Sequence, residues 1–131
     1  MSGITNLAAI LKTISPVLKE GSYVFCTVEN NAAIDVSDIV AFFREEEAIT
    51  VILAKETADR LNLTYSFVSA WITLTVHSSL EAVGLTAAFS TALTNNAISC
   101  NVVAAYYHDH IFVPVEKAKE AMHVLASLAN D

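Results

Sequence analysis

The chain has 131 residues, of which 54% are hydrophobic and 16% are charged. A chain this apolar buries enough surface on folding to offset its ordering entropy, which excludes intrinsic disorder, and we expect another subunit to cover part of its surface. Seven basic against fourteen acidic residues give a net charge of −7, so we expect neither nucleic acid nor an anionic membrane as a partner.

The first half of the chain predicts two helices and three strands, the third of which is the beginning of a strand run that continues into the second half near Ala70. Apolar residues at helical spacing predict a helix from Ile4 to Ile14, which Pro16 prevents from simply continuing. The sequence then predicts a strand at 23–28, a looser stretch at 29–47, a strand at 49–53 and a short helix at 55–61.

The second half begins with the strongest strand pattern, at 64–77, where Ile72 and Leu74 alternate with Trp71 and Thr73. An apolar stripe from Leu85 to Leu93 predicts a helix that ends at Asn95–Asn96. A strand at 98–105, a turn at 106–109, a strand at 110–113 and a final helix from 118 to 129 follow. This order predicts an α+β fold in which helices pack on one face of antiparallel sheets. We expect two halves, 1–69 and 70–131, to pack as one unit.

The cysteines and the absence of targeting signals favour a cytoplasmic protein. Cys26 and Cys100 lie far apart, each in an apolar segment, as is typical of reduced core thiols. We expect no signal peptide, because the first residues lack a basic stretch followed by an apolar one. Polar residues interrupt the uncharged segment 82–107 too often for a membrane span.

The second half resembles an ACT domain. The resemblance lies in the strand 71–76, a loop that ends in Gly84, a helix that runs to an Asn-x-Ile turn, and the strand 98–103. The whole chain resembles a family of small stand-alone bacterial proteins built from tandem ACT-like modules. The matching segments are 43–45 with 48–50, then 71–83 and 106–114, with Ala48 where the family has glycine. The nearest functional relatives of this stand-alone family are the regulatory ACT pairs of aspartate kinases.

This resemblance implies a ferredoxin-like βαββαβ fold in each half and no catalytic activity. It also implies that an amino acid or a similar small metabolite binds between paired modules and regulates a partner. The ligand-contacting positions that it implies are Val83, Gly84, Leu85, Cys100 and Asn101.

The residues themselves leave two interpretations of that region open. The amides at the end of the loop 78–84 suit an α-carboxylate, Gly84 lets a ligand approach the backbone, and Asn101 offers both a donor and an acceptor. Alternatively, Gly84 only shapes the turn, and the Asn101 side chain only forms hydrogen bonds with the polar groups of a loop.

Two further groups are candidates for chemistry. Arg44 is able to fork onto a ligand carboxylate or to pair with an acidic neighbour. His108 and His110 would share one face of a strand and could chelate a divalent metal, but two histidines do not complete a zinc site. A hairpin turn explains Asp109 without a metal.

Catalysis finds little support in the sequence. No G-x-S-x-G elbow, G-x-G-x-x-G motif or P-loop occurs, so we expect no enzyme and no cofactor. Three hypotheses follow. The first is an amino-acid-binding regulatory module that acts through ligand-dependent association, as a homodimer or a higher oligomer. The second is an oligomerisation scaffold without a ligand, and the third is a small metal-binding protein that uses His108 and His110.

Overall fold

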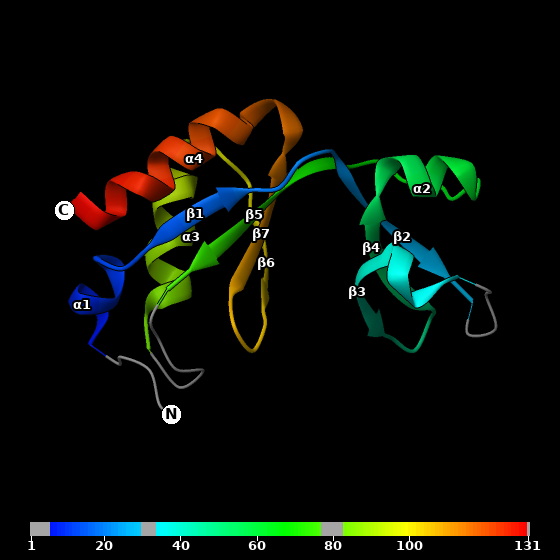
Figure 1. Ribbon diagram of the computed structural model, residues 1–131, viewed down its shortest axis with the longest axis horizontal. Coiled ribbons are helices and arrows are strands. Elements are labelled where there is room, and N and C mark those ends of the chain that lie inside the picture. The colour runs from blue at the N-terminus through cyan, green and yellow to red at the C-terminus, as the bar shows by residue number, and fades with distance from the viewer. Residues whose placement is uncertain (1–5, 30–33, 77–82, 131) are drawn as a thin grey trace. The chain divides into compact units, whose positions relative to one another are not determined.

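The computed structural model describes residues 6–29, 34–76 and 83–130, and the chain divides into two compact units (Figure 1). One unit consists of Met1–Lys19 together with Trp71–Asp131, and the other of Glu20–Ala70. We call them the outer unit and the inner unit, after their places in the sequence. Both combine antiparallel strands with helices, so the predicted α+β class is confirmed.

The compact units do not coincide with the predicted halves 1–69 and 70–131, and those domain boundaries stay a prediction. The first nineteen residues belong with the later part of the chain, because strand β1 (Ser15–Leu18) pairs antiparallel with strand β5 (Val68–Thr75). In this register Ser15 lies opposite Thr75 and Leu18 opposite Ile72. β5 itself crosses the division, since its residues up to Ala70 belong to the inner unit.

The outer unit has its strands in the order β1-β5-β7-β6. Its remaining elements are α1 (Leu7–Leu11), α3 (Leu85–Asn95), β6 (Asn101–Ala104), β7 (Asp109–Pro114), α4 (Ala118–Ser127) and two 3-10 turns, Val115–Lys117 and Leu128–Asn130. The predicted stripe on α3 is confirmed, because Leu85, Phe89 and Leu93 recur every fourth residue and are all buried. Among the described residues, no helix is both long enough and apolar enough to cross a membrane.

The N-terminal part of the outer unit departs from prediction. α1 covers only Leu7–Leu11 of the helix that was predicted from Ile4 to Ile14, and a strand that was not predicted follows it. This strand, β1, contains Pro16, which has no N–H to donate to a ladder. Among the described strands β1 pairs only with β5, so it is an edge strand, where proline is tolerated.

The inner unit has its strands in the order β3-β4-β2-β5. Its elements are β2 (Tyr23–Val28), a 3-10 turn (Val36–Asp38), β3 (Ile39–Arg44), β4 (Ile49–Ala54), α2 (Lys55–Arg60) and the start of β5. The core consists of Val24, Cys26, Val51, Leu53 and Ala58, which are all buried.

β3 was expected to be part of a looser stretch, and that expectation was wrong. The strand pairs antiparallel with β4, with a register shift between Ile39 and Ala41. Phe42 and Phe43 are consecutive and are both exposed, so β3 lacks the alternation of buried and exposed residues by which strands are recognised.

Candidate functional site

The start of α3 holds the first group of predicted ligand positions. Gly84 is the residue that precedes the helix, with φ 94°, and its carbonyl oxygen accepts the Ala88 N–H at 2.9 Å. A Cβ atom on Gly84 would lie 3.2 Å from Cδ2 of Leu7. Both the backbone conformation and the close approach of α1 therefore require glycine here. Residues 78–82 of the predicted loop lie outside the described residues.

The two neighbours of Gly84 face different surroundings. Val83 is 84% exposed, whereas the Leu85 side chain is buried in the core. Leu85 therefore offers a ligand its backbone N–H rather than its side chain. No side chain of the described residues caps the first amides of α3.

Cys100 and Asn101 lie at the other end of α3. The helix has 11 residues, and at a rise of about 1.5 Å per residue it spans about 16 Å. The Ile98 N–H still donates to the Leu93 carbonyl at 3.0 Å, so the chain is at the C-terminal end of the helix three residues before Asn101. Figure 1 likewise shows α3 and β6 beginning at opposite ends of this unit. One copy of the unit therefore does not bring Gly84 and Asn101 together.

Arg44 is the last residue of β3 and belongs to the inner unit. Its side chain is exposed, and its guanidinium carbon lies 5.8 Å from the centre of the Phe42 ring. Arg44 forms no ion pair with any residue that the structure describes. The expected pairing with an acidic neighbour is therefore not observed within those residues.

The predicted histidine pair contains a polar contact that sequence reasoning missed. The indole Nε1–H of Trp71 donates to Nδ1 of His110 at 3.0 Å, and Thr73 Oγ1 lies 3.1 Å from the same nitrogen. Because an indole only donates, Nδ1 of His110 must be an acceptor and the neutral ring carries its proton on Nε2. Burial, followed by the charges of His108 and Lys19, holds the pKa of His110 below its usual value of 6.5.

His108 and His110 do not gain a further metal ligand. Their ring centres lie 6.1 Å apart, and no group of three or more His, Cys, Asp or Glu side chains within the described ranges could hold a metal ion. Asp109 begins β7 instead of completing the turn, and burial raises the pKa of its carboxyl group. Burial also raises the pKa of the Cys100 thiol.

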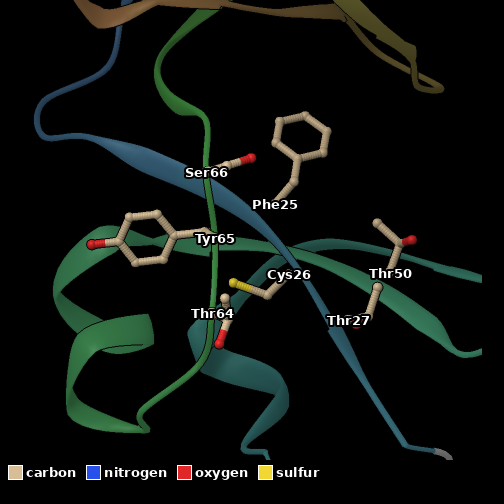
Figure 2. A pocket seen from close by; sticks show the side chains of 7 residues that line it. All are labelled: Phe25, Cys26, Thr27, Thr50, Thr64, Tyr65 and Ser66. Carbon is tan, nitrogen blue, oxygen red and sulfur yellow. The ribbon is translucent and has the colours of Figure 1, made fainter.

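A cavity of about 430 Å³ in the inner unit was not predicted (Figure 2). It is lined by Phe25, Cys26 and Thr27 of β2, by Thr50 of β4, and by the segment Thr64–Ser66. Sequence reasoning assigned that segment to the strand 64–77, whereas β5 begins only at Val68. The cluster of hydroxyl groups at 64–66 was the available signal.

Comparisons with known proteins agree with this architecture. ACT domain family models match residues 2–70 and 66–127. The crystal structure of a Vibrio cholerae protein of unknown function, described as a possible transport protein, is 49% identical with a TM-score of 0.83, over 98% of this chain and 99% of that one. A search of curated proteins finds no match.

Two structures of lower identity share the fold. A putative C-terminal regulatory domain of aspartate kinase from Porphyromonas gingivalis is 14% identical with a TM-score of 0.59, over 90% of this chain and 98% of that one. The aspartate kinase of Clostridium acetobutylicum is 9% identical with a TM-score of 0.60, over 89% of this chain but 34% of the kinase. The chain therefore belongs to the ACT domain family and carries two such domains in tandem.

Proposed function

We propose that this chain is a cytoplasmic, non-catalytic regulatory module that binds an amino acid and acts through ligand-dependent association of its copies. The observation that carries the proposal is the pair of ACT domain matches, over residues 2–70 and 66–127. ACT domains are typically regulatory modules that bind small molecules, and solved aspartate kinase structures with this fold include a putative regulatory domain.

The geometry of the outer unit supports a site that is completed by a second copy. Within the described residues no side chain caps the amides at the start of α3, and Gly84 leaves the backbone open to close approach, which suits the carboxylate of an amino acid. Asn101 is exposed and offers both a donor and an acceptor for the remaining polar groups, but it begins β6, which follows the C-terminal end of α3. A ligand that contacts both Gly84 and Asn101 would thus join two chains.

The test combines thermal unfolding with sedimentation, in the presence of each of the twenty amino acids. One amino acid, or a few related ones, should raise the melting temperature by several degrees and shift the protein to a larger assembly. Asn101→Ala should abolish both effects, while Asn95→Ala, on the exposed side of α3, should retain them. An unchanged melting temperature and assembly state across the panel would contradict the proposal.

The alternative hypothesis, an oligomerisation scaffold without a ligand, is favoured by one observation. Phe42 and Phe43 are 54% and 70% exposed on β3, an edge strand whose free side is able to pair with another copy. Under this hypothesis Phe43→Ser should dissociate the assembly, and no amino acid should change the assembly state.

A further inference from the structure

The cavity of the inner unit lies between β2 and the segment 64–66, at the point where the pairing of β2 with β5 ends. β2 pairs antiparallel with β5 at Tyr23–Ser69 and Val24–Val68, and the described pairing ends there. Continued in the same register, Cys26 would lie opposite Ser66, but the segment 64–66 is not a strand. The cavity of about 430 Å³ occupies this separation, and its volume is in the range of small-molecule sites.

The lining is rich in hydroxyl groups that are available to a ligand. The hydroxyls of Thr27, Thr64 and Ser66 form no hydrogen bond with any residue that the structure describes. Thr50 donates its hydroxyl hydrogen to the Glu45 carboxylate, so it can still accept a hydrogen bond from a ligand. Tyr65 donates to Asp59 at 2.7 Å, and Figure 2 shows its ring pointing away from Thr27 and Thr50.

The rest of the lining is uncharged and partly apolar. The Phe25 ring packs against Phe67 with ring centres 6.2 Å apart, which holds it at the cavity wall. Cys26 is buried, and burial, followed by the charge of Asp59, raises the pKa of its thiol and keeps it neutral. Among the described residues no charged side chain lines the cavity, so a charged ligand would lose its hydration without gaining an opposite charge.

The charges just outside the cavity select further against anions. The carboxylates of Glu45 and Asp59 each accept a hydrogen bond from a lining hydroxyl, but only Glu45 has no cationic partner among the described residues, so an anionic ligand would meet like charge at Glu45. Asp59 is itself paired with Lys55 at 3.0 Å, which leaves it less able to attract a cation.

We propose that the cavity formed by β2, β4 and the segment 64–66 binds a small uncharged polyhydroxyl compound, of the size of a monosaccharide or a cyclitol. The ligand's apolar face packs against Phe25, and its hydroxyl groups exchange hydrogen bonds with Thr27, Thr64 and Ser66. This site lies in a different unit from Gly84 and Asn101 and takes a different class of ligand from the amino-acid site proposed above.

The test is a titration of the whole isotope-labelled chain, followed by amide NMR, with D-glucose and myo-inositol as uncharged probes. D-glucose 6-phosphate is the anionic comparator. At least one uncharged probe should produce saturable shifts at the amides of residues 25–27, 50 and 64–66, and the phosphate ester should bind more weakly. Amides at 83–85 and 101 report the other proposed site, so the two proposals succeed or fail separately.

Variants that remove one hydroxyl each complete the test. Thr27→Val and Thr64→Val should each weaken binding of the probe by about two- to tenfold, which corresponds to the loss of one hydrogen bond. Thr91→Val, the same change on the exposed surface of α3, should leave binding unchanged. Ser66→Ala provides a second route if a valine variant does not fold. The proposal is overturned by the absence of saturable shifts with both uncharged probes, by tighter binding of the phosphate ester, or by hydroxyl-deleted variants that bind as the parent does.

Discussion

Trp71 and His110 are joined by a hydrogen bond in which the indole N–H donates to Nδ1 of the imidazole at 3.0 Å. Both residues belong to the outer unit, where the Trp71 ring also stacks on Phe112 and lies 5.5 Å from the Lys19 ammonium group. Trp71 is the only tryptophan of the chain, so its fluorescence reports on this contact.

Protonation of His110 should destabilise the outer unit. The folded state lowers the pKa of His110 below 6.5, so the unfolded state binds more protons once the pH falls below that value. Stability is therefore retained above about pH 6.5 and is lost as the pH falls toward the lower pKa of the folded state. Denaturant unfolding, followed by Trp71 fluorescence between neutral and mildly acidic pH, measures this loss. His110→Gln should lack this part of the pH dependence, and an equal slope in both proteins would contradict the assignment.

Asp109 should have the opposite pH dependence. Burial raises the pKa of its carboxyl group above the usual 3.8, so ionisation disfavours the folded state and the stability cost is present above the folded pKa. Asp109→Asn should thus increase stability at neutral pH, and the gain should shrink as the pH falls through the raised pKa. Parallel denaturant titrations of the two proteins measure it. A variant that is less stable at neutral pH would show that the carboxylate has a favourable role instead.

Gly84→Ala should destabilise the chain more than Gly21→Ala does. Both glycines have a positive φ, 94° and 93°, which costs an L-residue about 1–2 kcal/mol. Only Gly84 adds a close contact, since the new Cβ would lie 3.2 Å from Leu7, whereas the nearest atom to a Cβ on Gly21 is the Tyr23 hydroxyl at 3.9 Å. The difference in unfolding free energy isolates the contact with α1. The extra destabilisation by Gly84→Ala should disappear when Leu7 is also replaced by alanine.

Phe89→Ala should cost about 3–5 kcal/mol of stability, because the side chain is fully buried on α3 and its removal leaves a cavity. The same change at Phe43, which is 70% exposed, should alter stability by less than about 0.5 kcal/mol if the outer edge of β3 is not paired with another copy of the chain. Chemical denaturation gives both values. A small loss at Phe89 would mean that the core of the outer unit rearranges to fill the space.

The elements that could be predicted were those with a regular pattern of burial. The repeat of Leu85, Phe89 and Leu93 predicted α3, and the alternating residues of 71–75 predicted most of β5. β1 and β3 carry no such pattern, because one is a short edge strand with Pro16 and the other exposes two consecutive phenylalanines. Their pairing depends on partners that are distant in sequence or on a register shift, and neither is visible locally.

The sites were less accessible to sequence reasoning than the fold. The ACT resemblance is confirmed, whereas contact of Val83, Gly84, Leu85, Cys100, Asn101 or Arg44 with a ligand stays a prediction. The Trp71–His110 bond joins residues that only the pairing of β5 with β7 brings together. The cavity depends on where the pairing between β2 and β5 ends, and that point is a property of the folded chain.

The pairing of β1 with β5 also determines the order in which the chain can fold during synthesis. Translation proceeds from the N-terminus, so β1 emerges well before β5, its partner, and before α4, which contacts it. The strands and the helix of Glu20–Ala70 have all emerged while α4 is still to be made. N-terminal segments usually fold first on the ribosome, but here β1 is the first strand to be made and remains unpaired until β5 has been synthesised. The inner unit can therefore finish folding while β1 still lacks its packing contacts with α4.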